Sequence, residues 1–114
     1  MEISFEGIGQ IVATFAMASG VEAGMAVAVT ADGTVGKGTA GAAPCGVVLA
    51  AREDSCAVQV GGFVRVAYTG TAPTVGYGTI GLDGNGGIKT VSTGGLTCLI
   101  AQVDTDGKTA VIKL

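Results

Sequence analysis

Hydrophobic and polar residues alternate along much of the chain, and the alternation is clearest near its centre. Between residues 57 and 68, valine occupies nearly every second position. A period of two with β-branched side chains is typical of strands with one buried face. An apolar run (45–50) and a charged turn (52–55) come just before. The pattern predicts three consecutive strands, which we expect to form a β-meander that bends at Gly61-Gly62.

Similar apolar segments, separated by glycine-rich turns, lie on both sides of this centre. Asp32-Gly33 and the segment 83–87 (Asp-Gly-Asn-Gly-Gly) indicate hairpin turns, because such turns need residues that accept positive φ. The strands expected outside the centre are residues 10–18, 25–30, 34–35, 79–82, 88–91, 96–103 and 109–114. The whole chain is therefore expected to be strands and turns.

The N-terminal segment also alternates. Ile3 and Phe5 fall on one side of an extended chain, and the residues between them are polar or acidic. Glycines follow at positions 7 and 9, so residues 1–9 form a possible arm. The arm is either an edge strand of this domain or a strand donated to a neighbouring subunit by β-addition.

The chain contains an internal repeat. Three phrases recur: Val-x-x-Gly at 21–24 and 75–78 (75 − 21 = 54), Cys with apolar residues at 45 and 98 (98 − 45 = 53), and Ala-Val at 57 and 110 (110 − 57 = 53). Repetition at a fixed period indicates two related structural units. Neither unit is large enough to bury a sheet face alone, so we expect both to pack into one small sandwich or barrel. Chance similarity in a chain rich in Gly, Ala and Val is the alternative.

Composition supports an all-β fold in a single domain spanning residues 1–114. The chain has 21 glycines without a collagen period, few aromatic residues and no tryptophan. Val, Ile and Thr favour strands. A core of small aliphatic side chains buries less area per residue than an aromatic core, and small domains of this kind often gain stability by oligomerising or docking. A protein partner is therefore expected.

Charge, apolar run length and cysteine spacing argue against several classes of protein. The formal net charge is −3 and no run of Lys or Arg occurs, which argues against nucleic-acid binding. The acidic N-terminus does not resemble a signal peptide, and no apolar stretch reaches the ~20 residues of a membrane span. Cys45, Cys56 and Cys98 lack metal-site spacing, so we expect reduced, mostly buried thiols.

Residue types that carry most enzyme chemistry are missing. The chain has no histidine, which removes the commonest general base and metal ligand. The segments 36–41 and 76–81 fit Gly-x-Gly-x-x-Gly, but that fingerprint needs a following helix, and none is expected. The segment 104–107 (Asp-Thr-Asp-Gly) lacks most ligands of a calcium loop. No catalytic residue, cofactor or metal is predicted, and the protein is not expected to be an enzyme.

Several phrases together point to a family. They are Val-x-x-Gly-x-x-Val with Thr-Ala-Asp-Gly-Thr-Val (21–35), Cys-Gly-Val-Val-Leu (45–49), Ala-Val-Gln-Val-Gly-Gly-Phe-Val-Arg-Val (57–66) and Tyr-Thr-Gly-Thr-Ala-Pro-Thr-Val-Gly-Tyr (68–77). With a closing apolar strand, this succession resembles the small capsid decoration, or cement, proteins of tailed bacteriophages and prophages. The resemblance covers most of the chain and rests on glycine-rich phrases.

This resemblance implies a β-rich fold, sometimes called a β-tulip, on the exterior of the virion head. It also implies binding to the major capsid protein as a homotrimer, after synthesis in the bacterial cytoplasm. We expect Ile3, Phe5, Phe15 and Met17 to make subunit or capsid contacts. The alternative is a structural binding domain of a phage tail or fibre component. An enzyme or a lipoyl-type carrier is a third reading, but neither expected hairpin tip holds the lysine that a carrier needs.

Overall fold

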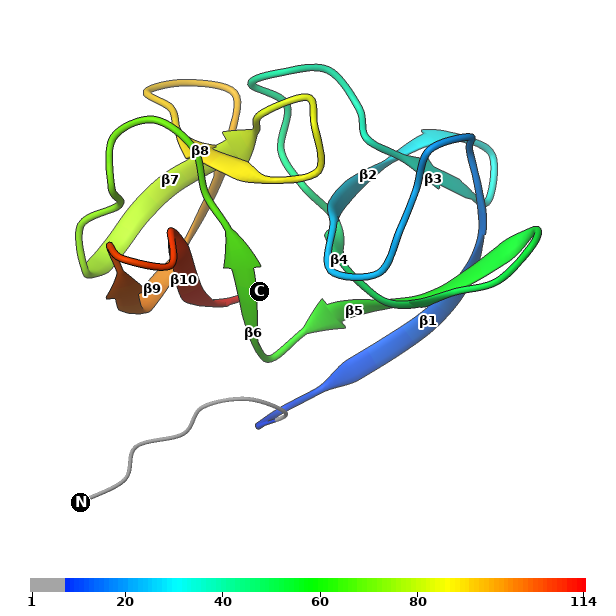
Figure 1. The fold of residues 1–114 in the computed structure, drawn as a ribbon, viewed down its shortest axis with the longest axis horizontal. Coiled ribbons are helices and arrows are strands. Elements are labelled where there is room, and N and C mark those ends of the chain that lie inside the picture. The colour runs from blue at the N-terminus through cyan, green and yellow to red at the C-terminus, as the bar shows by residue number, and fades with distance from the viewer. Residues whose placement is uncertain (1–7) are drawn as a thin grey trace.

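A computed structural model describes residues 8–114 of the chain, and residues 1–7 lie outside that description. The described chain consists of strands, turns and loops, which confirms the all-β class (Figure 1). Its strands are β1 (Ile11–Met17), β2 (Ala26–Ala31), β3 (Thr34–Gly36), β4 (Gly46–Ala51), β5 (Ser55–Gly61), β6 (Phe63–Ala67), β7 (Gly76–Leu82), β8 (Ile88–Thr90), β9 (Leu96–Asp104) and β10 (Thr109–Lys113). All the strands expected between residues 10 and 114 are present, although β7 begins at Gly76 instead of residue 79.

The first five strands form a closed barrel in the order β1-β3-β2-β4-β5. β5 pairs antiparallel with β1 and so completes the ring. The contact between β1 and β3 is parallel and short, since it joins only Ala16 to Thr34 and Met17 to Val35. This barrel is the right-hand half of the molecule in Figure 1.

The last five strands repeat this arrangement as a sheet in the order β6-β10-β9-β7-β8. Each strand pairs as its counterpart five strands earlier does: β6 with β10, β10 with β9, β9 with β7, and β7 with β8. Even the parallel contact recurs, as a single bridge between Tyr68 and Ile88. The two pseudo-repeated halves predicted from the sequence are therefore present as two copies of one strand topology.

Residue pairings confirm part of the repeat. The pair Ala50–Ala57 joins β4 to β5, and the pair Val103–Ala110, 53 residues later, joins β9 to β10 (103 − 50 = 53; 110 − 57 = 53). The Val-x-x-Gly phrases do not correspond in the structure: Val21 is buried in the barrel, whereas Val75 is 62% exposed before β7. That part of the sequence alignment is wrong.

The expected central β-meander is also wrong. β4 and β5 pair with each other, but β6 pairs with β10 in the other half. The chain changes direction at Gly62, where φ is +85° and an added Cβ would lie 2.5 Å from the backbone of Gly9. Only glycine adopts this positive φ readily and also leaves room for the backbone of Gly9. The predicted bend is confirmed, and it transfers the chain from one half to the other.

Each half has its own aliphatic core. The core residues of the barrel are Val21, Val27, Val35, Val48, Cys56 and Val58. Those of the second half are Val64, Val66, Tyr68, Ile80, Leu82, Ile88, Cys98, Ile100, Ala110 and Ile112. Ala26 and Val47, from β2 and β4, belong to the second core. The halves thus lie side by side with a shared apolar contact.

Backbone hydrogen bonds join the two halves. The N–H of Ala26 donates to the carbonyl of Gly86, at 2.7 Å. The N–H of Gly41 donates to the carbonyl of Leu82, and the N–H of Leu82 donates to the carbonyl of Ala42, both at 2.8 Å. These bonds tie the start of β2 and the long loop before β4 to the β7–β8 hairpin, so the relative position of the halves is fixed at several places.

Candidate interaction surface

The structure places the predicted contact residues as follows. Phe15 and Met17 are half-buried, and they pack against the barrel core from β1. Ile3 and Phe5 lie outside the described residues. Contacts of these four residues with a partner stay a prediction. From Val12 to Ala16 the outward-facing positions of β1 are the even-numbered ones, because a strand alternates its faces and Phe15 and Met17 face inward. Ile11 lies beyond a register shift in the β1–β5 pairing and is exposed as well.

The exposed apolar side chains lie elsewhere. Those of large size are Ile8, Ile11, Val12, Val29, Leu49, Val75 and Tyr77. Ile8, Ile11 and Val12 fall within five residues at the start of β1, where Ile11 is 61% exposed. Sequence reasoning selected the bulkier Phe15 and Met17 instead. Ile11 and Val12 could have been found from the rule that the bulkier apolar face of a strand is usually the buried one.

The start of β1 also has an open sheet edge. β5 pairs with β1 along its length, but β3 pairs only with Ala16 and Met17. Within residues 8–114, no strand pairs with the other edge of β1 over residues 11–15. An edge without Lys, Pro or another protecting residue is a template for an added strand. We call this feature, with Ile11 and Val12 on it, the β1 edge.

A second exposed region lies on the other half. Two adjoining hollows of about 200 and 370 Å³ share Thr71 and Thr90. Further threonines and Lys89 line them, and Val75 and Tyr77 line the smaller of the two. Tyr77 is 81% exposed. This region, which we call the threonine groove, offers hydroxyl groups beside an aromatic ring.

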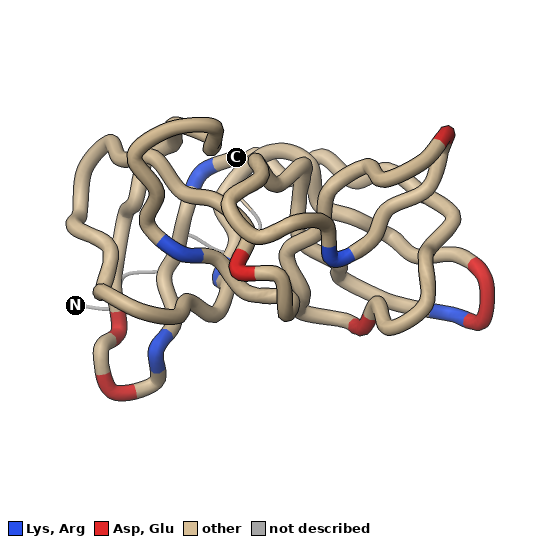
Figure 2. The backbone as a smooth tube through the Cα atoms, turned by 90° about the horizontal axis from the view of Figure 1, so that it is seen from above, with Lys and Arg blue, Asp and Glu red and all other residues tan. Residues whose placement is uncertain are grey.

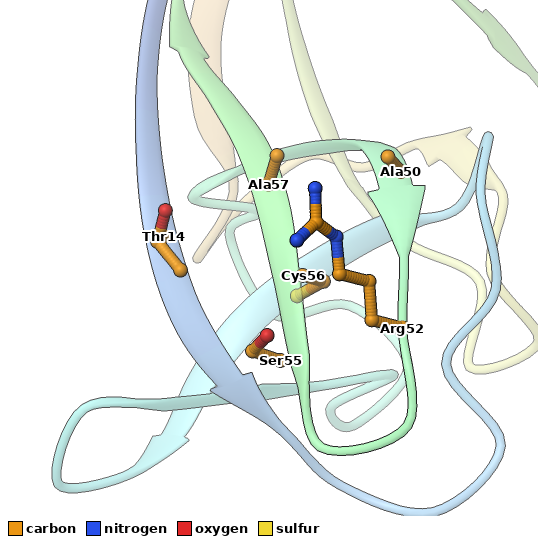
Figure 3. A pocket seen from close by; sticks show the side chains of 6 residues that line it. All are labelled: Thr14, Ala50, Arg52, Ser55, Cys56 and Ala57. Atoms are coloured by element: carbon orange, nitrogen blue, oxygen red, sulfur yellow. The ribbon is translucent and has the colours of Figure 1, made fainter.

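A smaller pocket of about 140 Å³ lies on the outer face of the barrel. Its lining residues are Thr14, Ala50, Arg52, Ser55, Cys56 and Ala57. Figure 3 shows the guanidinium of Arg52 extending between Ala50 and Ala57, with Thr14 on the neighbouring strand. The lining combines one cation with small side chains, and it holds no acid–base pair.

The cysteines are free thiols. Cys56 lies in the barrel core and Cys98 in the second core, while Cys45 is only partly buried. Burial raises the pKa of all three thiols, which keeps them protonated near neutral pH. A protonated thiol is a poor nucleophile. The expectation of reduced, mostly buried cysteines is confirmed.

The acidic turns have structural roles. The Asp104 carboxylate accepts hydrogen bonds from the backbone N–H groups of Asp106 and Gly107, at 3.0 and 3.1 Å, so the segment that resembled part of a calcium loop is a β-turn. In residues 8–114, no group of three acidic or cysteine side chains could hold a metal ion. Figure 2 shows that Asp and Glu gather mainly at turns, which leaves much of the strand surface uncharged.

No helix within residues 8–114 has the length and apolar character needed to cross a bilayer. No protein-family model matches the chain, and no curated protein sequence matches it either.

Proposed function

We propose that this protein is a capsid decoration protein of a tailed bacteriophage or prophage, bound to the outside of the head through the major capsid protein. The observation that carries the proposal is that each half bears its own exposed apolar region. The β1 edge belongs to the barrel, and the threonine groove with Tyr77 belongs to the second half. A rigid body with two separate contact regions is suited to bridging two subunits.

Bridging explains how modest contacts could hold such a small protein on a shell. Two linked contacts act at high effective concentration, so their combined attachment exceeds that of either alone. A trimer would multiply the contacts again. Attachment across neighbouring capsid subunits would oppose the outward force of the packaged DNA. The net charge of −3 disfavours adhesion to nucleic acid.

The resemblance of the glycine-rich phrases to decoration proteins supports the same conclusion. The β-tulip description and the location on the virion exterior come from that resemblance. The β1 edge adds a specific mode of attachment, in which a strand of the capsid protein pairs with the backbone of residues 11–15.

Electron microscopy of heads prepared with and without the protein tests the proposal directly. The heads should come from the phage whose genome encodes the chain. We expect additional density on the head exterior when the protein is present. Density confined to the tail would instead support the alternative of a tail or fibre domain, and absence of binding to either would contradict both.

The substitution Thr14→Pro tests the role of the β1 edge. The N–H groups of Ala16 and Ala18 point toward β3, so by alternation the N–H of Thr14 points to the open edge. Proline there blocks an incoming strand without removing a bond to β5. We expect at least tenfold weaker binding to heads in a co-sedimentation assay. Thr14→Val, which keeps the N–H, should bind like the unchanged protein, and equal binding by both variants would remove the β1 edge from the mechanism.

A further inference from the structure

Small side chains leave a hollow on the outer face of the barrel, where β1, β5 and β4 lie side by side. Thr14 of β1 pairs with Ala57 of β5, and Ala57 pairs with Ala50 of β4. Directly opposite residues of antiparallel strands share a face, so the three side chains form one row across the sheet. The pocket of about 140 Å³ lies over this row, because the two alanines fill little of the space above the strands.

Arg52 is held beside this pocket by its own backbone. The residue follows β4, and its N–H donates to the carbonyl of Ser55 at 2.8 Å. This bond closes the turn between β4 and β5, so the Arg52 side chain starts from a fixed point. Figure 3 shows that its guanidinium lies over the hollow, between Ala50 and Ala57. We call the hollow, with Arg52 and Ser55 on it, the Arg52 pocket.

The polar side chains of the Arg52 pocket have no partner within residues 8–114. There the Arg52 guanidinium makes no ion pair, and the Ser55 hydroxyl makes no hydrogen bond. Glu53 and Asp54, the nearest acids in the sequence, are exposed and do not line the pocket. A guanidinium and a hydroxyl can both donate hydrogen bonds. The pocket therefore suits a negatively charged acceptor that comes from outside the chain.

The size of the pocket and the charges around it favour a single carboxylate over other anions. Sites for whole metabolites or cofactors usually exceed about 300 Å³, so 140 Å³ suits one side-chain group. The fork of the guanidinium matches the two oxygens of a carboxylate. Glu53 and Asp54 add negative charge to the same turn, which disfavours a doubly charged phosphate and the backbone of a nucleic acid.

The Arg52 pocket adjoins the β1 edge. Thr14 forms the wall of the pocket on that side, and its backbone N–H points to the open edge. A strand added to the edge would lie about 4.8 Å beyond β1. Its side chains on the outer face would then stand beside the pocket. A carboxylate that enters the pocket would come from the same partner that pairs with residues 11–15.

We propose that the Arg52 pocket binds the carboxylate of an acidic side chain of the protein that pairs with the β1 edge, with the guanidinium and the Ser55 hydroxyl as donors. The choice of partner rests on the proposed function, which takes the added strand from the major capsid protein. Strand addition uses backbone groups and accepts many sequences, whereas the Arg52 pocket selects among them by charge. Arg52 is thus the specificity-determining residue of this contact.

Substitution of Arg52 tests the pocket on phage heads. Arg52→Gln removes the charge, and we expect about tenfold weaker binding in the co-sedimentation assay, because a hydrogen bond between charged groups is lost. Arg52→Lys keeps the charge without the planar fork and should give an intermediate loss. Lys113→Gln, at an exposed position of the second half, changes the net charge equally and should bind like the unchanged protein. The same loss for Lys113→Gln, or none for Arg52→Gln, would overturn the proposal.

Titration of the isolated protein with sodium acetate tests the pocket without heads. At constant ionic strength, made up with chloride, the amide NMR signals of Ser55 and Ala57 should shift saturably in the unchanged protein and not in Arg52→Gln. Absence of a saturable shift would overturn the carboxylate site even if the protein binds heads. Saturable acetate binding without attachment to heads would support the carboxylate site and overturn the capsid partner. Inorganic phosphate that acts at lower concentration than acetate would overturn the choice of a carboxylate.

Discussion

At the scale of single residues, the corner between the halves depends on one buried polar side chain. Gln59 is 2% exposed, and its Nε2 donates to the carbonyls of Gly61 and Phe63, at 3.0 and 2.9 Å. Those carbonyls flank Gly62, where the chain leaves the barrel. The amide therefore fixes the path of the backbone at the point where the fold passes from one half to the next. An aliphatic residue of similar size would fill the space without donating to either carbonyl.

Gln59→Leu is expected to lower the free energy of unfolding by roughly 2–4 kcal/mol, because it removes the two hydrogen bonds that the buried Gln59 amide donates to the backbone. Urea denaturation followed by circular dichroism measures the change. Gln10→Leu is the control: the Gln10 amide reaches Gln59 Oε1 only at 3.4 Å and is partly exposed. Its effect should be under about 1 kcal/mol. Similar losses for both variants would show that the two carbonyls do not need Gln59.

At the scale of elements, aspartates organise the hairpin turns of the second half. Asp83 Oδ1 accepts the N–H groups of Asn85 and Gly87, at 2.7 and 3.0 Å, at the end of β7. Its other oxygen accepts the hydroxyl of Thr69 at 3.2 Å. Asp83 thereby links the β7–β8 turn to the loop that follows β6. Asp104 likewise accepts two backbone N–H groups at the β9–β10 turn, and both donors belong to that turn.

Asp83→Ala is expected to cost roughly 1–3 kcal/mol of stability, since it removes acceptors from two backbone N–H groups and from Thr69. Asp83→Asn keeps a carbonyl oxygen for the backbone and should lose less than half as much. Thermal unfolding of the three proteins gives the comparison. An Asn variant as unstable as the Ala variant would mean that the charge, and not the turn geometry, is what stabilises the hairpin.

At the scale of the whole molecule, the halves are two copies of one topology that share part of a core. Ala26 and Val47 of the barrel pack with the second core, and three backbone hydrogen bonds cross between Ala26, the loop before β4 and the β7–β8 hairpin. Each half has only about 50 residues, a size at which an isolated core is rarely enough for stability. We therefore expect the two halves to unfold together.

The tyrosines allow this coupling to be measured. Tyr68 and Tyr77, the only two in the chain, both lie in the second half, so their fluorescence reports on that half alone. Val58→Ala, in the barrel core, should lower the urea midpoint seen by tyrosine fluorescence as much as the midpoint seen by circular dichroism. Ile80→Ala in the second core should cost about 2–5 kcal/mol by both probes. A fluorescence midpoint unaffected by Val58→Ala would show that the halves unfold independently.

Much of the strand content could be predicted because it is local. Alternating valines and Asp-Gly turns act over a few residues, so the expected strands after residue 10 all occur, and the bend at Gly61-Gly62 was visible as two adjacent glycines. The repeat was visible too, where β4–β5 and β9–β10 keep the same pairing at an offset of 53. Sequence similarity identified equivalent positions of the two halves less reliably where the loop lengths differ, as for Val21 and Val75.

The candidate surface was harder to predict, for a physical reason. Phe15 and Met17 were expected on a partner surface, but which face of a strand is buried depends on the strands that surround it. Here the barrel buries the face with Phe15 and leaves Ile11 and Val12 exposed. The open edge of β1 results from β3 being too short to cover it, which no local pattern reveals.

The sequence by itself therefore determined the all-β class, the strand positions, the turns and the duplication, since each follows from short-range backbone preference or from a count of residues. Only the tertiary structure decided that β5 and β6 part at Gly62, that the first half closes into a barrel, and which apolar side chains face outward. Those features depend on pairings between residues tens of positions apart, where many registers are compatible with the same alternation and packing selects one.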